Sequence, residues 1–160
     1  MYKVLLVDDE ALIREAISEN TRWKELGYEL MGTCKNGREA MERLDQEEAD
    51  LVLTDICMPY VDGMELTRYL YEHHRGVKVI IISGYDDFEY AKTAVKYQVM
   101  DYILKPITAK ELAQTLTRVK EKLDEERFQK SDMKRIRGAY MSNLPILRGR
   151  FMISLLMVNV

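Results

Sequence analysis

The sequence predicts an α/β protein with a doubly wound parallel sheet. Short, continuous runs of branched apolar residues recur along the chain, and such runs are typical of strands that helices cover on both faces. Segments with the apolar spacing of helices separate these runs. Strands and helices that alternate in this way form parallel neighbours joined by right-handed crossovers, which places helices on both sides of one sheet.

Five strands are expected. Three apolar runs are the clearest of them, at residues 4–7, 51–53 and 79–82. Residues 28–34 and 100–104 are weaker candidates, and the first of these has the mixed composition that an edge strand can have. A helix is expected after each strand.

Each expected helix has apolar residues spaced so that they form one stripe. The pair Thr108 and Glu111 forms a capping box that marks the start of the last helix. The stripes are Leu12, Ile13, Ala16 and Ile17; Ala40 and Leu44; Leu66 and Leu70; Ala91, Ala94 and Val95; and Leu112, Leu116, Val119 and Leu123.

Length and composition fit one domain with some residues to spare. The chain has 160 residues, of which 47% are hydrophobic and 32% charged, and its net charge of −3 gives no basic field for nucleic acid. Cys34 and Cys57 are too few for a disulfide scaffold or a zinc site of usual spacing. Apolar runs are shorter than the roughly 18 residues of a membrane span, and no signal peptide is recognisable. The sequence therefore predicts a cytoplasmic protein without a membrane segment.

Polar and charged residues follow four of the expected strands. Asp8 and Asp9 follow the first strand, Asp55 the third, Ser83 the fourth and Lys105 the fifth. The carboxyl ends of the strands form the functional edge of an open parallel sheet. Each motif alone is more often a turn or a helix cap. Their joint occurrence at the strand ends predicts a single site.

The residues of this site point to phosphoryl chemistry. Three neighbouring carboxylates repel one another strongly unless a cation is present. All-oxygen ligands favour Mg²⁺ over zinc or copper. A carboxylate beside Mg²⁺, a lysine and a hydroxyl can accept a phosphoryl group, because the cations neutralise the phosphoryl oxygens while the carboxylate attacks in line.

The pattern resembles the receiver domain of bacterial two-component response regulators. The resemblance covers about residues 1–125 and implies a flavodoxin-like (βα)5 fold with strand order 2-1-3-4-5 and, beyond it, a C-terminal helical extension. The matching segments are Val7-Asp8-Asp9-Glu10, Thr54-Asp55-Ile56-Cys57-Met58-Pro59, Asp62-Gly63, Ser83-Gly84, Tyr102 and Lys105-Pro106.

The resemblance implies a role for each residue of the site. Asp55 is the phosphoacceptor and takes the phosphoryl group from a sensor histidine kinase. Asp9 is a direct carboxylate ligand of Mg²⁺, Asp8 acts partly through water, and the phosphoacceptor Asp55 and the backbone carbonyl of Cys57 complete the protein's ligands. Lys105 pairs with the phosphoryl oxygens.

Two further residues resemble the switch positions of receivers. Ser83 hydrogen-bonds the phosphoryl group once it arrives, and Tyr102 then turns inward; a half-buried strand tyrosine without a switch role is the alternative for Tyr102. The Lys105-Pro106 peptide bond is commonly cis in the family. Phosphorylation biases the surface of the fourth helix, fifth strand and fifth helix, which is a candidate homodimer face.

A narrower resemblance is to receivers of AraC-type response regulators, and it rests on residues 83–92 and 23–28. Tyr60 and Gln98 depart from that pattern because they stand where Gly is frequent. A left-handed backbone at a residue other than Gly costs about 1 kcal/mol. Cys57 and Tyr85 resemble the receiver positions that set how fast water reaches the acyl phosphate, and the resemblance implies that the bulky Tyr85 shields it.

Residues 126–160 are expected to form a helical linker and the start of a following region that is cut off. The last 33 residues carry six basic side chains and one acidic one. An apolar stripe continues weakly at Met133, Ile136 and Tyr140, which would pack within one chain or pair two copies. Asn143-Leu144-Pro145 marks a new start. By resemblance a helix-turn-helix domain follows, so DNA would be bound only through the missing part.

The leading prediction is thus a phosphorylation-activated regulator, a phosphoacceptor switch rather than an enzyme. A stand-alone receiver that signals by protein contact is one alternative. A Mg²⁺-dependent aspartyl-phosphate phosphatase is another, but it needs an Asp-x-Asp motif after the first strand, which Asp8-Asp9-Glu10 lacks. A nucleotide-binding protein is disfavoured because the first strand is followed by no Gly-rich loop.

Overall fold

Five parallel strands form one sheet in the computed structural model, which describes residues 1–84 and 88–142, with side chains up to residue 130. The strand order is β2-β1-β3-β4-β5, which confirms the predicted order and fold class. Tyr85 and residues 143–160, including the expected start at Asn143, lie outside the described residues. The strands are β1 Tyr2–Val7, β2 Tyr28–Cys34, β3 Leu51–Thr54, β4 Lys78–Ser83 and β5 Asp101–Leu104.

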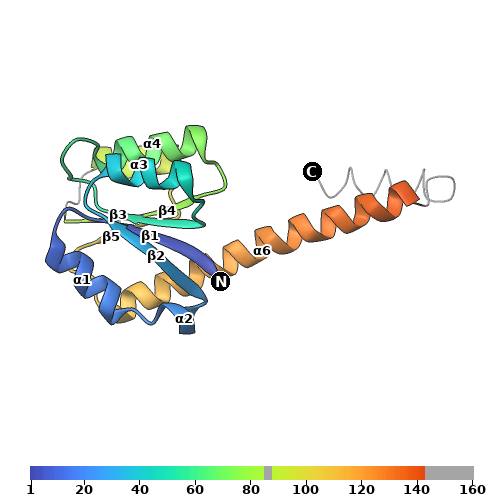
Figure 1. Ribbon diagram of the computed structural model, residues 1–160, viewed down its shortest axis with the longest axis horizontal. Coiled ribbons are helices and arrows are strands. Elements are labelled where there is room, and N and C mark those ends of the chain that lie inside the picture. The colour runs from blue at the N-terminus through green and yellow to red at the C-terminus, as the bar shows by residue number, and fades with distance from the viewer. Residues whose placement is uncertain (85–87, 143–160) are drawn as a thin grey trace. The chain divides into compact units, whose positions relative to one another are not determined.

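Helices cover both faces of this sheet. α3 and α4 lie on one face, while α1 and the first turns of α6 lie on the other (Figure 1). α6 continues to Ser142, so the predicted C-terminal helical extension is present. The helices are α1 Ala11–Asn20, α2 Trp23–Leu26, α3 Gly37–Gln46, α4 Gly63–His73, α5 Phe88–Lys96 and α6 Ala109–Ser142.

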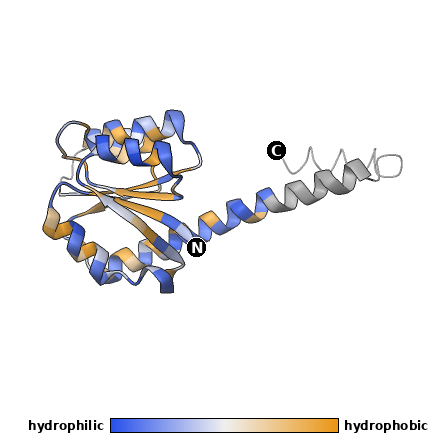
Figure 2. Ribbon diagram, in the orientation of Figure 1, coloured by the Kyte–Doolittle hydropathy of each residue, from blue (hydrophilic) through white to orange (hydrophobic). Residues whose placement is uncertain are grey.

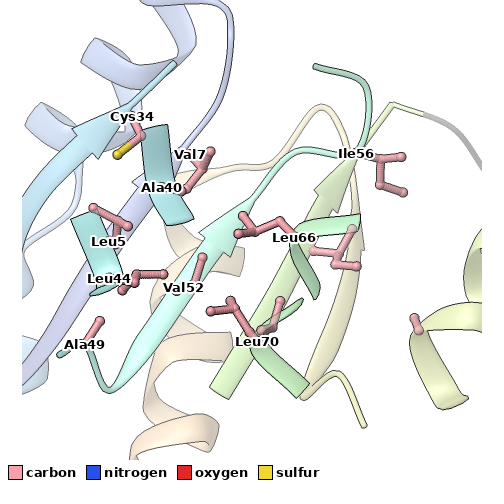
Figure 3. Close-up of a cluster of buried hydrophobic side chains, with 13 residues drawn as sticks. Leu5, Val7, Cys34, Ala40, Leu44, Ala49, Val52, Ile56, Leu66 and Leu70 are labelled. Carbon is pink, nitrogen blue, oxygen red and sulfur yellow. The ribbon is translucent and has the colours of Figure 1, made fainter. Parts of the chain in front are cut away.

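The apolar strands account for the core. Orange, hydrophobic strands lie between helices whose outer positions are mostly blue in Figure 2. Because side chains alternate along a strand, each strand supplies residues to both layers. Figure 3 shows the layer that β1 and β3 form with α3 and α4, where the labelled side chains come together. These are Leu5, Val7, Cys34, Ala40, Leu44, Ala49, Val52, Ile56, Leu66 and Leu70.

The strand register brings the expected site residues to one edge. Val7 lies opposite Thr54, so Asp8 and Asp55 leave neighbouring strands at the same level. The amide of Asp55 donates to the carbonyl of Val7 at 2.9 Å, which extends the pairing by one residue. In the β4–β5 pair Ser83 lies opposite Leu104, and Lys105 follows Leu104 directly in the chain.

Two features of the helices differ from the prediction. The four-residue helix α2 was not expected, because one turn is too short to show apolar periodicity; its Trp23 is buried and donates its indole N–H to the carbonyl of Ser18 at 3.1 Å. The helices expected from the stripes that contain Leu12 and Val95 are present, but these two residues lie outside the core. Their side chains are 80% and 79% exposed, and Ile17 and Ala94 are the residues of those stripes that reach the core.

The chain separates into two units, Met1–Val119 and Lys120–Val160. The predicted boundary near residue 125, and the pairing or packing of Met133, Ile136 and Tyr140, stay predictions because the described side chains end at residue 130. Among the described helices none combines the length and apolar character that a membrane crossing requires.

The two residues that stand where Gly is frequent do adopt the left-handed backbone. Tyr60 has φ 68° and Gln98 has φ 56°. Gln98 ends α5 in a Schellman motif, since its amide donates to the carbonyl of Val95 and the amide of Val99 donates to that of Ala94. Gln98 therefore occupies a left-handed position in which its Cβ is sterically unfavourable and in which a glycine would carry no such cost.

Replacing Gln98 by glycine is expected to raise the free energy of unfolding by about 1 kcal/mol, because the side chain no longer opposes the left-handed backbone. Urea unfolding of the wild type and Gln98→Gly measures the change. Gln98→Ala is the matched control: it removes the same polar group but keeps the Cβ, so its stability should not rise. Equal stabilisation by both variants would contradict the strain argument.

Candidate functional site

The ammonium group of Lys105 lies between two buried carboxylates. Its Nζ is 3.1 Å from Oδ2 of Asp8 and 3.5 Å from Oδ2 of Asp55. The two acids are 3% and 7% exposed, whereas the Lys105 side chain keeps 19% of its surface in contact with solvent. The structure therefore brings together three residues that the sequence places at the ends of three different strands.

Backbone groups fix the orientation of both carboxylates. Oδ1 of Asp8 accepts from the amide of Glu10 at 2.9 Å, and Oδ1 of Asp55 accepts from the amide of Ile56 at 2.8 Å. In each residue one carboxylate oxygen is held by the following loop and the other is turned toward Lys105. Both carboxylate groups are thus held in defined orientations at this edge of the sheet.

The environment shifts the protonation of this group of residues. Burial raises the pKa of Asp55; the Lys105 ammonium opposes this rise, and the charge of Asp8 adds to it. Burial alone would lower the pKa of Lys105, but its hydrogen bond to Asp8 and the charges of Asp8 and Asp55 outweigh burial and raise that pKa. Lys105 therefore stays cationic, and it is the charge that makes ionised Asp55 tolerable in a buried position.

Oxygen ligands for a hard cation lie beside Lys105. Single carboxylate oxygens of Asp8, Asp9 and Glu10 lie within 4.8 Å of one another. Asp8 and Asp9 are predicted metal ligands, whereas Glu10 was not among the predicted ligands. The predicted ligand Asp55 is not a member of this cluster, and its Oδ2 lies 3.5 Å from Nζ of Lys105. An all-oxygen set with one buried carboxylate and two exposed ones fits a partly hydrated Mg²⁺, which prefers oxygen ligands and retains waters.

The remaining predicted residues lie at the end of β4, on β5 and in the loops that follow β3 and β5. Ser83 is fully buried at the end of β4, and its carbonyl accepts the amide of Lys105 at 2.7 Å. The Lys105-Pro106 peptide bond is cis, as the resemblance implies. Tyr102 is half-buried on β5 and packs against the core cluster. Cys57 is exposed two residues after Asp55. The roles of these residues stay predictions.

This arrangement agrees with what the chain is similar to. The sequence pattern of the response regulator receiver domain matches residues 4–117. The chain belongs to this family. Among curated relatives, the transcriptional regulatory protein YesN of Bacillus subtilis is 39% identical over 119 residues, or 74% of this chain and 32% of YesN. Transcriptional regulatory protein HptR of Staphylococcus aureus is 38% identical over 129 residues, or 81% of this chain and 50% of HptR.

Solved receivers share the fold. The REC domain of AraT, a response regulator from Geobacillus stearothermophilus, is 40% identical with a TM-score of 0.74, covering 79% of this chain and 98% of that one. A two-component transcriptional regulator AraC from Clostridium phytofermentans is 31% identical with a TM-score of 0.73, over the same shares of the two chains. The receiver spans a third to a half of the length of the two curated relatives, YesN and HptR.

Two glycines near the loop that follows Asp55 were not among the predicted site residues. The amide of Gly63 donates to the carbonyl of Ile56 at 2.7 Å, and a Cβ on Gly63 would clash with the carbonyl oxygen of Asp55. Gly37, at the start of α3, meets the same loop at Val61. Only the Asp62-Gly63 pair carried a signal in the sequence, as part of the receiver motif. Gly37 contacts Val61, a residue far along the chain, and local spacing does not reveal such a contact.

Replacing Lys105 by methionine, which keeps much of the side-chain volume, is expected to lower the free energy of unfolding by about 3 kcal/mol at pH 7 without divalent cations. The reason is that Asp8 and Asp55 would then face each other without the ammonium. Urea unfolding measures the change. Lys3→Met is the matched control, because the Lys3–Glu47 pair is more than 40% exposed on both sides and its loss should cost about 0.5 kcal/mol or less. Equal costs would disprove the special position of Lys105.

The two cysteines are expected to react very differently with a thiol reagent in the native protein. Burial, with a smaller contribution from the Glu39 carboxylate, raises the pKa of the Cys34 thiol to about 11, so it stays protonated and covered at pH 8. Cys57 is exposed. Mass spectrometry after iodoacetamide treatment should find Cys57 modified and Cys34 intact. Modification of both in urea is the control, and native modification of Cys34 would refute its burial.

Proposed function

We propose that this receiver is the input domain of a phosphorylation-activated response regulator. It accepts a phosphoryl group from a sensor histidine kinase on Asp55 and thereby controls an output, most directly transcription. The observation that carries the proposal is the Lys105 ammonium within 3.5 Å of the carboxylates of both Asp8 and Asp55. A carboxylate beside a fixed cation at the edge of a parallel sheet is equipped to receive a phosphoryl group.

The transfer step is a displacement at phosphorus. A carboxylate oxygen of Asp55 forms the new O–P bond while the P–N bond to the donor's phosphohistidine breaks, and the electron pair of that bond remains on the imidazole nitrogen. Lys105 lies within reach to neutralise phosphoryl oxygens. Asp8, Asp9, Asp55 and the backbone carbonyl of Cys57 would hold Mg²⁺, which when bound neutralises charge on the phosphoryl group.

The same proposal gives Ser83 and Tyr102 switch roles. A phosphoryl group adds about −1.5 to −2 charge and new acceptor oxygens next to Ser83 and Lys105. Because the carbonyl of Ser83 already accepts the amide of Lys105, movement at one of these residues affects the other. Tyr102 lies on β5, two residues before Leu104, which pairs with Ser83. Phosphorylation would then favour a second arrangement of α5, β5 and α6.

The face formed by α5, β5 and α6 supports a homodimer in the activated state. Two of these elements carry exposed large apolar side chains: on α5 Phe88 is 77% and Val95 79% exposed, and on β5 Leu104 is 43% exposed. A second copy would remove these from water, which favours association. Pairing through the extension of α6 is the other route to a dimer.

The transcriptional output is proposed from the relatives. YesN and HptR are named as transcriptional regulatory proteins, and this chain spans 32% and 50% of their lengths. An AraC-type helix-turn-helix domain outside this chain would bind DNA, and the kinase would meet the receiver in the cytoplasm. On this proposal Asp55 is a stoichiometric acceptor with at most slow hydrolysis, and the receiver is not a turnover enzyme.

Incubation with acetyl phosphate and Mg²⁺ is expected to add one phosphoryl group to the wild type and none to Asp55→Asn, because only the carboxylate at residue 55 can attack. Intact mass spectrometry measures uptake. Asp45→Asn is the matched control, since Asp45 is an exposed acid that binds Tyr69 and His74, and it should leave uptake unchanged.

Two results would contradict the proposal. Uptake that persists in Asp55→Asn would place the acceptor elsewhere. Continuous release of many phosphates per protein molecule, without accumulation of the phosphorylated form, would indicate the Mg²⁺-dependent phosphatase instead of a receiver switch. Chelation of divalent cations should abolish uptake if Asp8 and Asp9 hold Mg²⁺ as proposed.

A further inference from the structure

The junction of β2 and α3, from the last strand residue Cys34 to the first helix residue Gly37, contacts both loops of the candidate phosphoacceptor site. The amide of Asp8 donates to the carbonyl of Cys34 at 3.0 Å. Three residues later the amide of Gly37 donates to the carbonyl of Val61 at 3.1 Å. Asp8 opens the loop that carries the acidic cluster, and Val61 belongs to the loop that follows Asp55. One short segment is therefore bonded to the backbones on both sides of the site.

The contact at Gly37 leaves no room for a side chain. A Cβ built on Gly37 would lie 2.5 Å from the carbonyl oxygen of Val61 and 2.8 Å from its Cγ1. The neighbouring Asn36 is buried, and its side chain accepts the amide of Glu39 at 2.8 Å, which caps α3 and fixes where the helix begins. The first residue of α3 thus packs directly against the loop backbone at Val61.

The loop that receives this contact is closed on itself. The amide of Gly63 donates to the carbonyl of Ile56 at 2.7 Å, so residues 56–63 form a loop with joined ends. Val61 packs against the core cluster with its half-buried side chain. The loop begins directly after Asp55 and contains Cys57. Within the loop the amide of Val61 donates to the carbonyl of Pro59 at 2.9 Å, and from outside it the amide of Gly37 donates to the carbonyl of Val61.

We propose that residues 34–37 act as a spacer that sets the separation between the Asp8 loop and the Asp55 loop, with Gly37 as the positioning residue. The inference rests on the proposed function, because the separation matters for the Mg²⁺ that Asp8, Asp9, Asp55 and the Cys57 carbonyl would hold. None of the predicted site residues lies on β2, yet the end of this strand sets the separation between the Asp8 loop and the Asp55 loop. A Cβ at residue 37 displaces the Val61 backbone and with it the loop that carries Cys57.

Gly37→Ala tests the spacer. The Mg²⁺ concentration that gives half of the maximal rise in melting temperature, without any phosphodonor, is expected to increase about tenfold, as for residues that orient metal ligands indirectly. The Mg²⁺ concentration for half-maximal phosphoryl uptake from acetyl phosphate should increase by the same factor. The uptake rate at saturating Mg²⁺ should change less, because Asp55 and Lys105 themselves are untouched.

Two controls separate positioning from general destabilisation. Gly76→Ala adds the same methyl group where nothing lies within 4 Å. Tyr28→Phe removes a buried hydrogen bond to the carbonyl of Leu116, at the opposite end of β2, so it lowers stability without touching either loop. Both variants should keep the Mg²⁺ dependence of the wild type.

Val61→Ala keeps the proposal testable should Gly37→Ala not fold. It loosens the same contact from the loop side and should raise the half-saturating Mg²⁺ concentration by a smaller factor. An unchanged Mg²⁺ dependence in the folded variants of this pair overturns the spacer while the proposed function stands. If instead Mg²⁺ neither stabilises the wild type nor promotes its phosphorylation, the proposed function fails, and the spacer with it.

Discussion

The edge of this sheet depends on one ammonium group placed between two buried carboxylates. Asp8 and Asp55 leave neighbouring strands at the same level, so their charges are forced together by the register of β1 and β3. Two such acids repel strongly when water is excluded. Lys105 relieves this repulsion from β5, which is separated from β3 by β4. Only a long side chain can reach across that distance, and a flexible lysine satisfies the requirement.

The buried sheet is what makes the arrangement possible. Its central strands are covered on both faces, so their registers are set by apolar packing and ladder hydrogen bonds rather than by the polar residues at their ends. The hydrogen bond from the Lys105 amide to the Ser83 carbonyl extends the β4–β5 pairing by one residue, as that from Asp55 to Val7 extends the β1–β3 pairing. The site is therefore built on rigid strand ends, with loops supplying only the last contacts.

Sequence reasoning reached the strand ends but not the contacts between loops. Asp8, Asp55, Ser83 and Lys105 could be placed because strand exits in a parallel sheet converge whatever the loops do. The stripes that contain Leu12 and Val95 correctly predicted two helices, but both side chains are exposed because periodicity gives the face of a helix and not how much of that face is covered. Gly37 was missed because its importance depends on Val61, and no local pattern reports a contact made across 24 positions of the chain.

The charge at the site explains why Lys105 alone is not sufficient for the proposed chemistry. One ammonium beside two carboxylates leaves the buried group with a single negative charge, and the exposed acids Asp9 and Glu10 add to the field. A phosphoryl group on Asp55 would replace one charge by about two. The acidic cluster beside Asp8 supplies the oxygen ligands that a divalent cation needs to offset this increase. The separation of the two loops then decides whether one cation can serve both Asp8 and the phosphoryl oxygens, and that separation is the quantity that Gly37 controls.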